Sequence, residues 1–238
     1  MQGSLNLYHL NMLRLVQLLL ILFSLLLNSC ARLPDYALPH IEETKSNQLS
    51  FKQGFTYRKL TVNDFRAPSL PEHMSEHAKH FNARSRIQIR PSTESQFIIN
   101  SSYNEYYDQI IWSGRIQSIV FEAVMLPDYS WWNPAVSREK IAYVLQHEQI
   151  HFALMELAAR HLTQQAQADI DAMHVIDSTR QGVHDQLLEK VKELIQAEHD
   201  EIIKEHTAFD EDTSLYNDPE KQQWWFDRVN NQLRDTTY

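Results

Sequence analysis

Residues 138–173 contain neither proline nor glycine, the two residues that most often interrupt a helix. Pro134 precedes this stretch, Ser137 can cap its amino end, and Glu139 falls in the first turn. Apolar residues recur along it at helical spacing. The pattern predicts one long amphipathic helix, which has to bury its apolar face against other elements of the chain.

Two more helices are expected after this one. Residues 177–182 contain Asp, Ser, Thr and Gly and predict a break. A second helix is then expected over residues 183–206, forming a helical hairpin with the first that turns near Asp177. A third, short amphipathic helix is expected around residues 224–233.

The part of the chain before Pro134 has a different character. Residues 85–90, 96–100 and 115–126 are rich in β-branched and aromatic residues, and residues 91–95 and 101–108 look like turns between them. These segments predict strands, most of them antiparallel. The predicted fold class is therefore α+β, a small antiparallel sheet region followed by a helical hairpin and a short C-terminal helix.

The N-terminus has the features of an export signal. Arg14 precedes an apolar run, and residues 18–27 contain no polar residue except Ser24, which is too short for a membrane-spanning helix. The run ends in the residues Leu-Asn-Ser-Cys, which resemble a bacterial lipobox with Cys30 as the lipidated residue. Cys30 is the only cysteine, so it has no partner for an internal disulfide. The alternative is an uncleaved N-terminal anchor with a chance cysteine.

This interpretation divides the chain into three parts. Residues 1–29 are the signal peptide, 30–50 a tether, and 51–238 one α+β domain with a sheet-rich part (51–132) and a helical part (133–238). The protein is then expected in the bacterial cell envelope, attached to a membrane by the lipid on Cys30. Ala31 after the cysteine favours the outer membrane.

Composition excludes two classes of binding protein. The net charge of −9 argues against a nucleic-acid binder, which carries a basic patch. The chain has only four glycines, so glycine-rich phosphate loops and dinucleotide-binding motifs are absent.

The long helix carries a candidate metal site in the stretch Gln-His-Glu-Gln-Ile-His-Phe, residues 146–152. His147 and His151 are four residues apart, so both imidazoles can reach one ion. In such H-E-x-x-H motifs two neutral imidazoles bind Zn²⁺, and the glutamate, here Glu148, is the general base for the metal-bound water. The alternative is a buried His–Glu–His hydrogen-bond network that only ties helices together.

A catalytic zinc site needs a third protein ligand. Glu156 lies about 140° around the helix from His151 and is better explained by an ion pair with Arg160. If the hairpin turns near Asp177, residues 203–207 return opposite the two histidines, which makes Glu205 the candidate. Glu205 could instead be an exposed carboxylate at a frayed helix end. The other candidates for this role are His206, Glu198, Glu201 and Asp210.

Two other groups of residues have simpler explanations. His73, His77 and His80 have metal-like spacing but lie in a polar stretch, residues 73–81, which favours a solvated surface. The pairs Trp131–Trp132 and Trp224–Trp225 are expected in the core or at an interface rather than at a substrate platform.

Four segments together resemble a known family. Residues 57–65 (YRKLTVNDF), 130–132 (SWW), 147–162 (HEQIHFALMELAARHL) and 209–213 (FDEDT) occur in the same order in the bacterial envelope family described as predicted secreted zinc-dependent proteases. The resemblance implies a zinc-dependent protease. One departure is that the family has a His-Gly pair shortly after the threonine of the last segment, whereas here Ser214, Leu215 and Tyr216 follow Thr213.

The expected function is a lipid-anchored envelope metallopeptidase with Zn²⁺ as cofactor and a protein or peptide as substrate. Its zinc ligands would be His147, His151 and Glu205, with Glu148 as the catalytic base. Two alternatives stay open. One is a catalytically inactive lipoprotein that acts as a binding or scaffold protein. The other is a zinc hydrolase of another substrate, such as a cell-wall amide.

Overall fold

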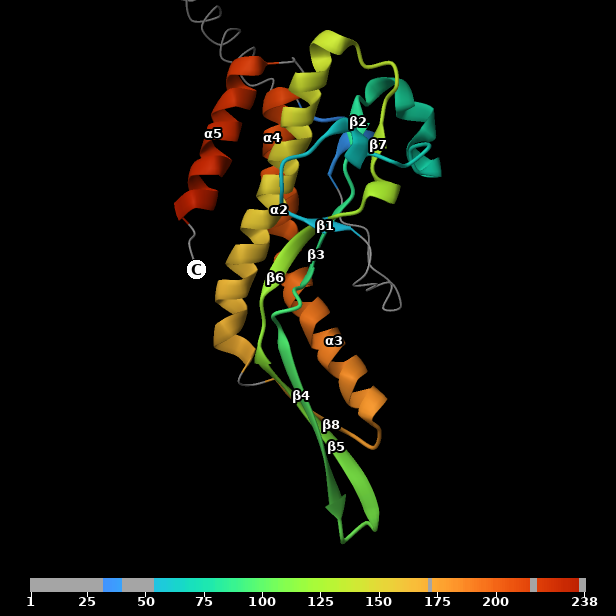
Figure 1. Cartoon of the computed structure of the whole chain (residues 1–238), viewed down its shortest axis with the longest axis vertical. Coiled ribbons are helices and arrows are strands. Elements are labelled where there is room, and N and C mark those ends of the chain that lie inside the picture. The colour runs from blue at the N-terminus through green and yellow to red at the C-terminus, as the bar shows by residue number, and fades with distance from the viewer. Residues whose placement is uncertain (1–31, 40–53, 171–172, 215–217, 236–238) are drawn as a thin grey trace, which may run out of the picture.

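The computed structural model describes residues 32–39, 54–170, 173–214 and 218–235 (Figure 1). The fold is α+β, as predicted. The strands are β1 (Phe55–Thr56), β2 (Ala83–Arg84), β3 (Ile87–Pro91), β4 (Gln96–Asn104), β5 (Gln109–Ser118), β6 (Phe121–Met125), β7 (Trp131–Trp132) and β8 (His174–Asp177). The helices are α2 (Ile141–Asp169), α3 (Arg180–Ala197), α4 (His199–Thr213) and α5 (Pro219–Asp235). Short 3-10 segments cover Asp35–Ala37, Val62–Asp64, Glu72–His80, Pro127–Tyr129 and Arg138–Lys140.

The described strands form three small antiparallel sheets. Their orders are β1-β6-β3, β2-β7 and β4-β5-β8. Residues 115–126, expected as one strand, are divided between β5 and β6, which belong to different sheets. The division falls at residues 119–120, where the Ile119 side chain is buried and the Val120 amide donates to Ser95 Oγ.

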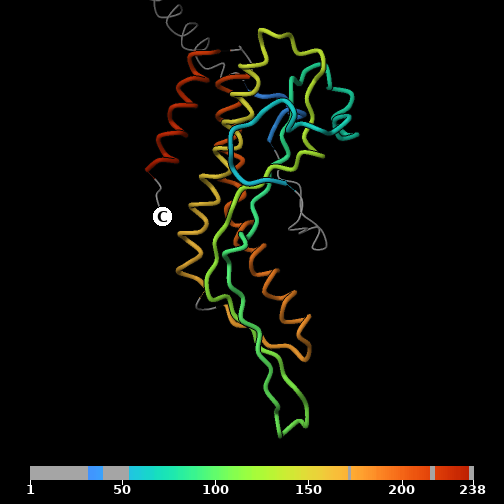
Figure 2. Tube along the Cα trace, in the orientation of Figure 1, coloured from blue at the N-terminus to red at the C-terminus, as the bar shows by residue number. Residues whose placement is uncertain are grey.

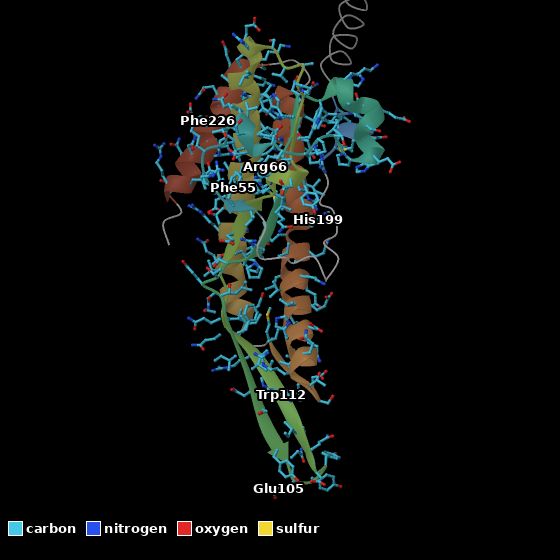
Figure 3. The ribbon with its side chains drawn as sticks, turned by 45° about the vertical axis from the view of Figure 1, so that its right-hand side comes forward. Phe55, Arg66, Glu105, Trp112, His199 and Phe226 are labelled. Carbon is cyan, nitrogen blue, oxygen red and sulfur yellow. The ribbon has the colours of Figure 1, made fainter. Side chains whose placement is uncertain are left out.

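Strands β4 and β5 form a long hairpin that contacts α3 and whose tip extends beyond the helices (Figure 1). The expected turn over residues 101–108 is shorter than predicted, because β4 continues to Asn104 and β5 begins at Gln109. Figure 3 shows Glu105 at the tip of this hairpin and Trp112 farther along it. Asp108 adopts a positive φ of 49° in the turn, a conformation that aspartate tolerates better than most residues.

Helix α2 is the central element. It lies within the predicted range of 138–173 but begins at Ile141, after the 3-10 segment Arg138–Lys140, and ends at Asp169. It packs against β6 on one side and against α5 on another. Two buried apolar clusters meet on it: a larger one shared with the sheets and α3, and a smaller one that includes Phe209 and Trp225. Burial on several sides explains how so long a helix is held, since most helical stability in proteins comes from packing.

The return from α2 differs in detail from the predicted hairpin. The chain first adds β8 to the edge of β5 and then enters α3, which Thr179 caps by accepting the Gly182 amide at 2.9 Å. The expected helix over 183–206 is two helices, because the chain breaks at Glu198 before α4 begins. The path nevertheless returns alongside α2, as the trace in Figure 2 shows, and brings α4 into contact with the first half of α2.

The predicted signal peptide and Cys30 lie outside the described residues, as does most of the predicted tether. Within the described ranges, no helix has the length and apolar character needed to span a membrane.

Candidate metal centre

Helix α2 places His147, Glu148 and His151 next to one another, in the middle of its first half. Their i, i+4 spacing brings the two Nε2 atoms of His147 and His151 to 3.2 Å from each other, with the rings nearly perpendicular. The two histidine side chains are only 16% and 14% exposed, and Glu148 is buried. The sequence prediction that these three residues point inward together is met by this geometry.

Asp210 on α4 completes a group of three potential ligands. Its Oδ1 lies 3.1 Å from His147 Nε2 and 3.0 Å from His151 Nε2. Among the described residues, His147, His151 and Asp210 are the one group of this kind whose donor atoms all lie within 4.8 Å of one another. Helices α2 and α4, which are far apart in sequence, therefore place two imidazoles and a carboxylate next to one another.

The donor atoms lie close enough together to bind one zinc ion. A tetrahedral zinc ion with bonds of about 2.0–2.1 Å separates its ligand atoms by about 3.3 Å. The three separations here are 3.0, 3.1 and 3.2 Å. Three protein ligands of the types His, His and Asp leave a fourth position for water or substrate, which is the composition of a catalytic rather than a structural site.

Glu148 lies beside this group and is fixed by the sheet region. Its Oε2 accepts a hydrogen bond from the Ser85 amide at 3.0 Å, in the short link between β2 and β3. It is therefore tied to the backbone and not to the neighbouring histidines. His147, Glu148, His151 and Asp210 all line one cavity of about 320 Å³. The carboxylate thus adjoins both the candidate ligands and a space that a substrate could enter.

The ligand side chains are held by residues of α4. Thr213 Oγ1 lies 3.4 Å from His147 Nδ1, and His206 Nδ1 lies 2.8 Å from His151 Nδ1. Phe209 is fully buried and packs its ring on both candidate ligand histidines, with centroid distances of 4.5 and 4.9 Å. Each imidazole therefore has a packing partner as well as a polar neighbour on its second nitrogen.

The charges of the group favour the ionised carboxylate. Burial on its own would raise the pKa of Asp210, but His151 and His147 hold that pKa well below its usual range. Burial lowers the pKa of His151 in turn, and Asp210 more than compensates, so the net shift is upward. For His206, burial and then the nearby charge of His151 lower the pKa to about 3, so this imidazole is neutral near neutral pH.

Glu205 does not join the histidines in this structure. Its carboxylate faces α5, where Arg228 lies at 3.2 Å. Of the other candidates from the sequence, Asp210 lies beside the Nε2 atoms of both histidines, and His206 contacts His151. Glu198 lies 3.5 Å from His161, and Glu201 pairs with Lys204 at the surface. Across the break at Glu198, Ile202 stays in the buried cluster of Leu187 and Val191. Beyond Ile202 the buried residues of α4 are His206, Phe209, Asp210 and Thr213, and Glu205 is not among them.

Other motif residues have structural contacts. Glu156 pairs with Arg160 at 2.9 Å, as predicted. Gln149 accepts the Leu60 amide at 2.7 Å and donates to the Arg58 carbonyl at 3.2 Å. Gln149 therefore docks the segment 57–65 on α2, which connects two of the sequence segments on which the family resemblance rests.

The remaining candidates lie apart from this centre. His77 stacks on Tyr36 with ring centroids 4.1 Å apart, and the described histidines near it form no group with metal-like geometry. Trp225 is buried and donates to Asp212, whereas Trp224 is 58% exposed. The tryptophan pair of α5 thus divides between core and surface.

Sequence reasoning named Asp210 only as one alternative and gave Thr213 no role. The signal was present, since both residues belong to the Asp-x-x-Thr segment of the family resemblance. Positions 215 and 216, near which the family has its histidine, lie outside the described residues.

None of three comparisons, with family models, curated proteins and solved structures, finds a match to this chain.

Proposed function

We propose that this chain is a zinc-dependent metallopeptidase of the bacterial envelope. The observation that carries the proposal is the meeting of His147 Nε2, His151 Nε2 and Asp210 Oδ1 within 3.2 Å of one another, beside Glu148 and in the wall of a cavity. Metal binding alone does not need Glu148. A buried carboxylate next to a His, His, Asp set is what hydrolysis by activated water requires.

Each residue of the site has its own role in the proposed hydrolysis. A zinc ion, when bound, lowers the pKa of water and polarises a carbonyl group. Glu148 takes the proton of the attacking water and then passes it to the leaving amine. The Ser85 amide keeps the Glu148 carboxylate in place through both transfers. The Asp210 carboxylate would offset one of the two positive charges of the ion.

The cavity supports an extended peptide as substrate. Residues 87–89 of β3 line it, and within the described residues β3 is an edge strand paired only with β6. The Leu126 amide donates to the Arg86 carbonyl, so by alternation the backbone groups of Ile87 and Ile89 point away from β6. An extended peptide can pair with such an edge.

The first test is the metal content of the purified full-length protein, measured by elemental mass spectrometry beside a His147→Ala variant. About one zinc per chain, lost in the variant, is the expected result for a single site with three protein ligands. Absence of zinc from a folded wild-type protein after incubation with zinc would refute the proposal.

The second test separates catalysis from metal binding. Glu148→Gln should retain zinc and lose hydrolysis of a fluorescent casein substrate. The matched control is Glu156→Gln on the same helix, which removes a carboxylate of the Arg160 ion pair and should leave the cleavage rate per folded molecule unchanged. If Glu148→Gln cleaved as fast as the wild type, Glu148 would not be the base.

Attachment to the envelope membrane through Cys30 is part of the proposal and rests on the sequence alone. Metabolic labelling with a clickable fatty acid should mark the wild-type protein and not a Cys30→Ser variant. Equal labelling of both would refute the lipoprotein assignment.

A non-catalytic binding role is the second candidate, because the β4–β5 hairpin exposes large apolar side chains near its tip. These are Tyr103, Tyr106, Tyr107 and Ile110, each more than half exposed. If this role were the correct one, Glu148→Gln would leave the cellular function intact, whereas replacing the hairpin tyrosines by serine would abolish it.

A further inference from the structure

His206 is a buried imidazole in direct contact with a candidate ligand. It lies on α4, one turn before Asp210, and is only 9% exposed. Its Nδ1 is 2.8 Å from His151 Nδ1. The two rings are nearly parallel, at 12°, and their centroids are 5.0 Å apart, so the nitrogens are much closer than the ring centres. The rings therefore meet edge to edge, as a hydrogen bond between them requires.

The ligand geometry decides which nitrogen of His151 carries the proton. His151 Nε2 faces Asp210 and His147, so Nε2 is the atom that would hold the metal. A metal-binding imidazole uses a lone pair, which leaves its proton on the other nitrogen. Among the residues that the structure describes, His206 Nδ1 is the one group at hydrogen-bond distance from His151 Nδ1–H, so it has to be the acceptor.

We propose that His206 is a positioning residue of the zinc site: its Nδ1 accepts the proton of His151 Nδ1 and fixes the ring and tautomer of that ligand. This inference rests on the proposed function, since it assumes zinc at His151 Nε2. Metal-binding histidines usually donate to a carboxylate, a carbonyl or water. Here a second, neutral imidazole occupies that place.

The same argument fixes the other nitrogen of His206. An imidazole that is neutral and accepts at Nδ1 carries its proton on Nε2. His206 Nε2 is buried, and it has no hydrogen-bond partner among the described residues. The side chain lines both the cavity at the ligands and a second cavity of about 340 Å³ between α2, α4 and α5.

His206 cannot be a fourth ligand of the same ion in this arrangement. Its near nitrogen faces Nδ1 of His151, whereas the Asp210 oxygen and His147 face Nε2 on the other side of that ring. A role as ligand and a role as positioning residue therefore predict different effects of substitution, and they can be distinguished.

The test is zinc affinity of three variants of the full-length protein, measured by competition with a chromophoric chelator. His206→Asn places an amide oxygen near the position of Nδ1 and should bind zinc within about threefold of the wild type, since the hydrogen bond is kept. His206→Leu removes the acceptor and should weaken binding by about 10–100-fold. His206→Gln carries its polar end near the Nε2 position and should resemble the leucine variant. Circular dichroism of the metal-free variants controls for folding.

The tautomer gives a readout that does not depend on affinity. Long-range ¹H–¹⁵N spectra of the zinc-loaded protein should show His206 with its proton on Nε2 and His151 with its proton on Nδ1. Wild-type protein that bound no zinc would refute the proposed function and this inference with it. Normal zinc binding in the wild type and in His206→Leu, or a His206 proton on Nδ1, would overturn this inference alone.

Discussion

One pair of substitutions on α4 tests which carboxylate would be the third ligand of the proposed zinc site. Asp210→Asn removes the charge of a carboxylate oxygen that lies 3.0 and 3.1 Å from the two histidine nitrogens. Glu205→Gln removes a carboxylate on the same helix that pairs with Arg228 at 3.2 Å instead. Both changes are nearly isosteric and lower the net negative charge by one.

The expected magnitudes differ by more than an order of magnitude. Loss of a residue that only orients a ligand typically weakens metal binding 10–100-fold, and loss of a ligand should exceed this. Asp210→Asn is therefore expected to weaken zinc binding at least ~100-fold, which is about 2.8 kcal/mol. Glu205→Gln should change the affinity less than about threefold, because the Glu205 carboxylate faces Arg228 instead of the histidines and a partly exposed ion pair contributes little.

The assay is zinc competition with a chromophoric chelator at one buffer and pH, with thermal unfolding of the metal-free proteins as the control for folding. Strong loss in Asp210→Asn with near wild-type binding in Glu205→Gln supports the structure. The reverse pattern would refute the reasoning, because it would mean that α4 is rotated relative to α2 and that the sequence-based choice of Glu205 is correct.

Three predictions concern the packing and charges that support the site. Phe209→Ala should lower the free energy of unfolding by about 3–5 kcal/mol in urea titrations, because its ring is fully buried against the ligands; a loss under about 1 kcal/mol would contradict this packing. Gly114→Ala places a Cβ 2.3 Å from a Val183 methyl and should cost about 1–3 kcal/mol by forcing α3 from β5; an unchanged melting temperature would argue against this contact. A hydrogen bond from Arg58, followed by hydrogen bonds from the amide and hydroxyl of Thr61, outweighs burial and holds the pKa of Asp64 below its usual value. Its stabilising contribution is therefore present above the ordinary carboxyl pKa of about 3.9 and lost as pH falls through the lowered value. Below the ordinary carboxyl pKa, the free energy of unfolding should therefore fall less steeply with decreasing pH in Asp64→Asn than in the wild type. An identical slope in both proteins would rule this out.

Local features of this protein follow from the sequence. The spacing of His147 and His151, the inward position of Glu148 and the Glu156–Arg160 pair all depend on one uninterrupted helix. Such a helix has a fixed rise and rotation per residue, so the relative positions of side chains four apart are set once the helix forms. The α+β class is also visible, because strand-like and helix-like segments are separated along the chain.

The sequence did not reveal the connections between these segments. β8 is only four residues long and ends in turn-forming residues, so its pairing with β5 has little local signal. The division of residues 115–126 between two sheets depends on which strands lie on either side. Strand pairing is a non-local interaction, and local composition does not specify the partner.

The sequence alone determined the two histidines and the glutamate of the site, because these lie on one helix with known periodicity. The tertiary structure decided that Asp210 rather than Glu205 meets them, and that His206 adjoins His151. That choice depends on where the second helical segment breaks and on its rotation against α2. Packing between α4 and α2, and not spacing along one helix, brings the Asp210 carboxylate to the two histidines.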